Sequence, residues 1–167
     1  MTVPFFITLQ EWLPQQQLTR LVGKIAASEK PWLKQLFIDR FIKAYGVNME
    51  EALQMIETAV AAEPQNGAIV DSLGWVLYQR GEYEDAVVHL ENSASLLPVD
   101  PIINDHLGDG LWAVGRFVEA RFQWNRALSF DPTEEDAIRI RRKLEIGLDA
   151  VLEQDGEPPL RAKNGDN

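Results

Sequence analysis

Apolar residues recur at helical spacing along most of the chain. Between residues 18 and 25 they fall three or four positions apart, which predicts an amphipathic helix. A wider apolar face follows between residues 32 and 45, and a polar-faced helix is expected from Glu134 to about Gln154. No segment alternates as a half-buried strand does, so we expect an all-α protein.

The middle of the chain repeats itself at one constant offset. Eight positions of residues 67–100 have counterparts at the same places in residues 101–134. The matched pairs are Leu73 and Leu107, Gly74 and Gly108, Gly81 and Gly115, Tyr83 and Phe117, Ala86 and Ala120, Leu90 and Trp124, Ser93 and Ala127, and Pro98 and Pro132. A fixed period of about 34 residues indicates stacked supersecondary units.

The repeated residues predict two helices in each unit. Gly74 and Gly108 lack a side chain, so the second helix of the unit can approach the first closely. Gly81 and Gly115 stand where the first helix ends and the chain turns. Ala86 and Ala120 are small for the same packing reason, and prolines end each second helix.

These residues resemble the tetratricopeptide repeat (TPR), with its Leu-Gly, aromatic, Ala, Ala and Pro signature. The resemblance implies a short right-handed helical solenoid with complete units at 67–100 and 101–134. Val70 and Asn104 stand where the repeat usually has Trp, so we expect one weaker packing contact in each unit.

Incomplete elements flank the two units. Residues 49–66 match only the second helix of a preceding repeat, through Ala52, Ile56, Ala59 and Pro64. Residues 135–154 are predicted to form one capping helix over the open end of the last repeat. The Gly- and Pro-rich residues 155–167 are expected to be a disordered tail.

Residues 1–48 follow a different pattern, and they resemble a second family together with the first residues of the half repeat. The residues that carry the resemblance are Leu13-Pro14, Leu18-Thr19-Arg20-Leu21, Gly23, Ala26, Leu33-Lys34, Ile38, Phe41, Lys43, Tyr45, Val47, Met49 and Glu51-Ala52. They are similar to the N-terminal helices of bacterial phosphatidylserine decarboxylase proenzymes, which implies an association with the membrane surface. The Leu-Gly-Ser-Thr self-cleavage motif of that family is missing, so we do not expect decarboxylase activity.

The two resemblances meet at residues 46–53, where the first family's helix end imitates the turn of a repeat. This smooth junction favours a chimera, made either by natural recombination or by a deliberate helix-sharing fusion.

Composition narrows the possible functions. The net charge of -10 argues against a nucleic-acid partner. Residues 1–48 hold six basic and three acidic residues, a net of +3, and the rest holds ten and 23, a net of -13. With no cysteine, no secretory leader and no membrane-spanning apolar run, we expect a cytoplasmic protein that is at most peripheral to a membrane.

The first helices of the repeats supply candidate residues for a peptide-binding groove. These are Asp71, Trp75, Tyr78, Gln79, Asp105, Asp109 and Trp112. They predict an acidic, aromatic-rimmed groove for a basic or amphipathic peptide, unless the groove is merely solvated. Asp105, His106 and Asp109 do not make a convincing metal site, and we expect a solvated polar face there. No catalytic motif and no cofactor motif is recognised.

The N-terminal segment supplies a second candidate surface, made of Trp12, Trp32, Phe37, Phe41 and Tyr45. It could cap the solenoid, bind another copy of the chain, or lie on an anionic membrane, and capping is favoured because the ends of a solenoid must be covered. The sequence therefore predicts a non-catalytic protein-interaction or assembly scaffold, with a membrane-surface adaptor as the alternative.

Overall fold

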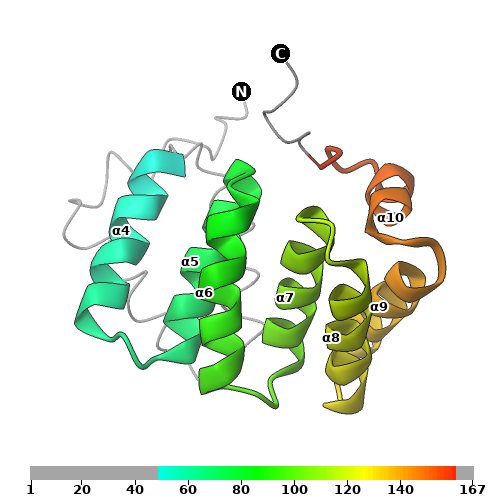
Figure 1. Ribbon diagram of the computed structural model, residues 1–167, viewed down its shortest axis with the longest axis horizontal. Helices are drawn as coiled ribbons and strands as arrows, with labels where there is room; N and C mark the ends of the chain where they lie inside the picture. Colours follow the sequence, from blue (N-terminus) through cyan, green and yellow to red (C-terminus); the bar gives the residue numbers. More distant parts are fainter. Residues whose placement is uncertain (1–48, 161–167) are drawn as a thin grey trace, which may run out of the picture.

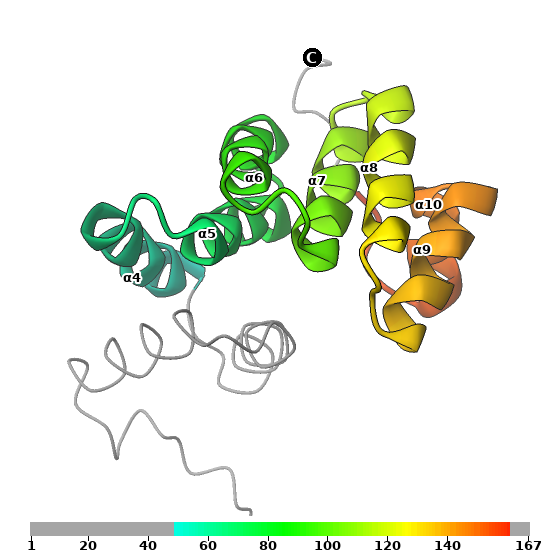
Figure 2. The ribbon, with the colours of Figure 1, turned by 90° about the horizontal axis from the view of Figure 1, so that it is seen from below.

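The computed structural model describes residues 49–160 of the chain, and these residues form helices joined by short loops (Figure 1). The helices are α4 (Met49–Ala62), α5 (Gly67–Arg80), α6 (Tyr83–Leu96), α7 (Pro101–Ala113), α8 (Phe117–Ser129), α9 (Glu134–Ile146) and α10 (Leu148–Asp155). Residues 49–160 contain no strand, which confirms the all-α prediction. Seen from below, the helices follow one another as an array (Figure 2), and one core runs from Leu53 in α4 to Leu152 in α10.

The two predicted repeats correspond to α5–α6 and α7–α8, and glycine makes the turn inside each of them. Gly81 has φ +83° and Gly115 has φ +82°, a left-handed conformation that glycine adopts without strain. Backbone N–H groups of the turn residues donate to the last carbonyls of the first helix, for example from Glu82 to Leu77 at 3.0 Å and from Arg116 to Leu111 at 2.9 Å.

The close approach of the paired helices also depends on glycine. A Cβ atom on Gly74 would lie 2.7 Å from Leu90 Cγ, and one on Gly108 would lie 2.3 Å from Trp124 Nε1. Leu90 and Trp124 occupy the same position of their repeats, so both repeats make the same contact. The predicted packing role of Gly74 and Gly108 is confirmed.

Each first helix begins at a side-chain cap. Asn66 accepts from the N–H of Ile69, Asp100 from those of Ile102 and Ile103, and Thr133 from that of Asp136. These caps satisfy N–H groups that have no partner inside the helix, and so fix where α5, α7 and α9 start.

The C-terminal region differs from the expected single helix over 135–154. The chain breaks at Gly147 (φ +86°), and α9 and α10 lie on either side of it. A Cβ atom at this position would come within 2.8 Å of the Trp112 ring, so the glycine allows the break to pack on α7. Leu148, Val151 and Leu152 are buried, as expected of a cap.

The predicted disordered tail also needs correction in part. Glu157 forms an ion pair with Arg139, and Leu160 packs against the hydrophobic core, so residues 156–160 stay with the helices. Residues 161–167 lie outside the described residues. The same holds for the predictions on residues 1–48, including the surface formed by Trp12, Trp32, Phe37, Phe41 and Tyr45.

Candidate functional site

The first helices of successive units lie next to one another and make the surface that we call the first-helix face. It is formed by α5, α7 and α9. Helices α5 and α7 are in contact, and the Lys143 side chain joins α9 to α7. All seven candidate groove residues stand on α5 or α7.

A buried acid–imidazole pair joins α5 to α7. His106 Nδ1 lies 2.9 Å from Asp71 Oδ2 and 3.0 Å from Oδ1, so the imidazole N–H donates to the carboxylate. The His106 ring also stacks on Trp75, with centroids 4.0 Å apart, and Trp75 stacks on Tyr78 at 4.8 Å. Burial disfavours the imidazolium ion, but the Asp71 carboxylate outweighs it, so the pKa of His106 is raised.

A buried lysine joins α7 to α9. Lys143 Nζ donates to Asp105 Oδ2 at 2.9 Å and to both Asp109 oxygens at 2.8 Å. Trp124 Nε1 donates to Asp109 as well, at 2.9 Å. Only 1% of Lys143 is exposed. A buried charge is stable only when it is paired and hydrogen-bonded, and this ammonium meets both conditions.

The electrostatics of this cluster follow from its burial. Burial raises the pKa of Asp109 to about 6, against the opposing effect of Lys143. Burial also disfavours the lysine ammonium, but Asp105 and Asp109 outweigh it, and the pKa of Lys143 is raised. The ion pair is therefore formed at neutral pH.

Trp112 stands at the α9–α10 side of the first-helix face. Its indole N–H donates to Asp149 Oδ2 at 2.6 Å, and the Arg121 guanidinium lies 5.7 Å from the ring centroid. The ring is only partly buried. Trp112 thus ties the cap to the second repeat and still presents ring surface.

The structure divides the seven candidate groove residues into two groups. Asp71, Tyr78 and Asp109 are buried, while Trp75, Asp105 and Trp112 are partly exposed and Gln79 is exposed. The expectation that Asp105, His106 and Asp109 form a solvated polar face is wrong, because His106 and Asp109 are 5% and 4% exposed. The described residues contain no group of three potential metal ligands.

Sequence reasoning missed Lys143 and the structural role of His106. A usable signal existed for the lysine, because Lys143 follows Asp109 by the same offset that separates the two repeats. The same offset indicates that α9 takes the place of the first helix of a further unit, in addition to capping the second repeat.

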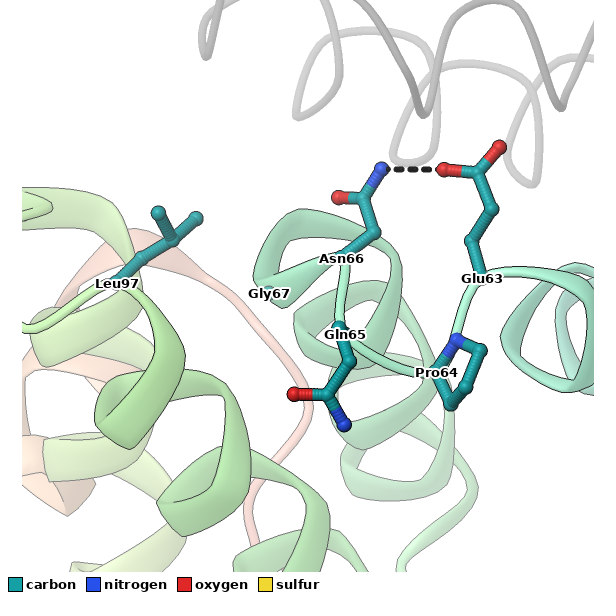
Figure 3. Close-up of a pocket in the computed structure, with 6 residues that line it drawn as sticks. All are labelled: Glu63, Pro64, Gln65, Asn66, Gly67 and Leu97. Atoms are coloured by element: carbon teal, nitrogen blue, oxygen red, sulfur yellow. Dashed lines mark hydrogen bonds between the residues drawn. The ribbon is translucent and has the colours of Figure 1, made fainter.

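A shallow pocket lies away from the first-helix face, between the α4–α5 loop and the end of α6 (Figure 3). Its lining residues are Glu63, Pro64, Gln65, Asn66, Gly67 and Leu97. Asn66 Nδ2 donates to Glu63 Oε2 at 2.8 Å, and the Asn66 carbonyl oxygen caps α5. These polar groups are engaged in holding the loop, and they form no catalytic set.

None of the helices between residues 49 and 160 is long and apolar enough to cross a bilayer.

Comparison with known proteins separates the two ends of the chain. The model of a protein family described as PSD matches residues 5–46. The phosphatidylserine decarboxylase proenzyme of Alcanivorax borkumensis is 51% identical over 47 residues, 28% of this chain and 16% of that protein. That of Saccharophagus degradans is 53% identical over 49 residues, 29% of this chain and 17% of that protein. The chain thus spans about a sixth of the length of these relatives.

Solved structures match most of the chain. The Yersinia enterocolitica type III secretion translocator chaperone SycD is 14% identical with a TM-score of 0.57, covering 83% of this chain and 95% of SycD. MamA of MSR-1 is 22% identical with a TM-score of 0.50, covering 85% and 87%. Identities this low show the fold alone. The chain accordingly has the fold of a TPR-type helical solenoid, and residues 5–46 are similar to part of the phosphatidylserine decarboxylase proenzymes.

Proposed function

We propose that this chain is a non-catalytic protein-interaction scaffold whose first-helix face binds a peptide segment of a partner. The supporting observation is the division of that face into buried, internally paired charges and partly exposed aromatic and polar side chains. The paired charges hold the helices in place. Trp75, Gln79 and Trp112 then remain as candidate contacts with a ligand, together with the partly exposed Asp105 carboxylate that also accepts from Lys143.

The same division bears on the chemistry of the ligand. The sequence suggested a basic or an amphipathic peptide, because three aspartates lie on the face. Two of these, Asp71 and Asp109, are buried against His106 and Lys143, and Asp105 shares the lysine. Their carboxylate oxygens are hydrogen-bonded inside the protein and so are less available to a ligand. We therefore propose an amphipathic peptide, held by its apolar side chains against the aromatic rings.

The test uses the full chain and a random library of dodecapeptides. Selected peptides are measured by calorimetry against the wild type, a Gln79→Arg/Asp105→Asn variant, and a Val118→Ser/Phe122→Ser control on the exposed side of α8. We expect the first variant to bind at least about tenfold more weakly, roughly 1.4 kcal/mol, and the control to bind as the wild type does. Loss of binding only in the control, or no peptide that binds at all, would contradict the proposal.

The similarity of residues 5–46 to proenzymes of a phospholipid decarboxylase supports a second candidate, a membrane-surface adaptor. In this proposal the aromatic residues of that segment insert into an anionic surface, as amphipathic helices do. The chain should then float with anionic liposomes at low salt, and a Trp32→Ser/Phe37→Ser/Phe41→Ser variant should not. Failure of the wild type to float would remove this candidate.

A further inference from the structure

The chain turns back on itself after α10. Gly156 adopts a left-handed conformation (φ +69°), and the Glu157 N–H donates to the Leu152 carbonyl at 2.9 Å, which ends the helix. Residues 156–160, which we call the C-terminal strap, then run from α10 toward the upper end of α7 (Figure 1). The strap therefore returns toward the repeats instead of leaving the solenoid.

One anchor of the strap is a charge pair on the first-helix face. Glu157 Oε1 lies 2.8 Å from Arg139 Nη1 on α9. The neighbouring pair of Arg142 Nη1 with Asp155 Oδ1, also 2.8 Å, fixes the direction in which the strap leaves α10. Glu157 thus stands over α9 in a defined position.

Glu157 also reaches the electrostatic surroundings of α5. Burial is the main cause that raises the pKa of Tyr78, and Asp109, Tyr83 and Glu157 add to it in that order. Tyr78 belongs to α5, whereas Arg139 belongs to α9, and α7 lies between these helices. The strap carboxylate therefore pairs with α9 and is still near enough to α5 to act on the Tyr78 hydroxyl.

The second anchor is apolar. Leu160 is partly buried and packs against the main hydrophobic core, while Pro158 and Pro159 between the anchors are exposed. Two adjacent prolines restrict the spacer to an extended form of about 3.1 Å per residue, which lowers the entropy lost on docking. An acidic anchor, a stiff spacer and an apolar anchor are the features expected of a peptide ligand.

We propose that the surface around Arg139 and Tyr78 is a peptide site, and that the C-terminal strap is its built-in occupant. A partner would present an extended segment with a carboxylate three residues before a leucine, with prolines between them, and would bind by displacing the strap. This rests on the proposed peptide-binding function and gives it a ligand class. Because the strap is tethered, its effective concentration is of millimolar order, and the closed form competes with every ligand.

The probe is a synthetic peptide with the sequence of residues 153–163, titrated into the isotope-labelled full chain and followed by NMR. A Glu157→Gln/Leu160→Ser variant of the chain releases the strap. Glu153→Gln, an exposed carboxylate on α10, is the matched control. We expect the peptide to bind the released variant, with shifts at Tyr78 and Arg139, and to bind the wild type and the control at least fivefold more weakly.

A peptide carrying the same two substitutions should bind none of the three chains. Equal binding to wild type and released variant would show that the strap does not occupy the site, and no binding to the released variant would show that the surface is not a site for this peptide. Either result overturns the proposal. If library-selected peptides still bind the first-helix face, the scaffold function stands without it; if they do not, both fall.

Discussion

The two complete repeats share a backbone but exchange an indole ring at one pair of equivalent positions. In the first repeat the tryptophan is Trp75, on the first helix, and the facing position on the second helix is Leu90. In the second repeat the corresponding positions are Asp109 and Trp124. Trp124 is fully buried and donates its N–H to Asp109, whereas Trp75 stacks on His106 and Tyr78 at the partly exposed surface.

The exchange shows what a buried acid requires. Asp109 can replace an aromatic ring because the second repeat supplies an indole N–H and the next helix supplies the Lys143 ammonium. The first repeat needs neither group at this position, since Trp75 carries no charge. The second repeat should therefore depend on its neighbours more than the first does.

Among the variants considered, the one that removes the Lys143 ammonium should lower the stability of the second repeat most. A Lys143→Met variant leaves Asp105 and Asp109 without their cation, and we expect the free energy of unfolding to fall by about 3–5 kcal/mol at pH 7.5. Urea denaturation of the full chain measures it. Arg141→Met is the control on the same helix, because Arg141 is exposed and its only described ion pair is a 4.0 Å contact with Glu134; its effect should stay within about 0.5 kcal/mol.

The same variant has a predictable pH dependence. The pKa of Asp109 is already raised to about 6 by burial, and loss of the ammonium raises it further. Protonation of Asp109 then removes the uncompensated charge. The loss of unfolding free energy in Lys143→Met, relative to the wild type, should therefore be smaller at pH 5 than at pH 8. A deficit that is equal at both pH values would indicate lost packing instead of an unpaired charge.

Substitution of Gly74 or Gly108 should have an intermediate effect on stability, and the effect should differ between the two repeats. An added Cβ atom at Gly108 meets a rigid, hydrogen-bonded indole at 2.3 Å, whereas one at Gly74 meets the leucine side chain at 2.7 Å. We expect Gly108→Ala to cost about 3 kcal/mol and Gly74→Ala about 1 kcal/mol, after the gain in helix propensity.

A double-mutant cycle tests the cause. Gly108→Ala should cost less in a Trp124→Leu background, because the indole that it meets is gone, with a coupling of about 1 kcal/mol or more. Additive effects would locate the strain elsewhere.

Much of the fold could be predicted from the sequence, because Gly74, Gly108, Ala86 and Ala120 report contacts that the backbone itself makes. The burial of the charges on the first-helix face was not predicted. Whether Asp109 is solvated or buried depends on Lys143, and the repeat offset between these two residues was the signal that α9 continues the array. Two predictions at the C-terminal end needed correction. The helical pattern continues through Gly147, where the cap helix breaks, and the Pro-rich residues that predicted a disordered tail lie between the anchors Glu157 and Leu160.

The smallest expected effect on stability concerns the pair of Asp71 and His106, which links the two repeats. The pKa of His106 is raised, so the stability that its protonation contributes is fully present below the ordinary histidine pKa and is lost as pH rises through the raised value. An Asp71→Asn variant should titrate at lower pH in the imidazole NMR spectrum. A His89→Gln variant leaves His106 as the only histidine and so assigns its NMR signals. An unchanged titration of His106 in Asp71→Asn would contradict the role given to Asp71.

The charge pairs also give the array a direction. Asp71 faces the His106 imidazole on the first helix of the next unit, and Asp105 and Asp109 face the Lys143 ammonium one unit later. A second copy of residues 67–100 inserted after residue 100 would set Asp71 against Ser72 of the copy, the position that corresponds to His106. The units are thus alike in shape but not interchangeable, and their order along the solenoid is specified by which acid meets which base.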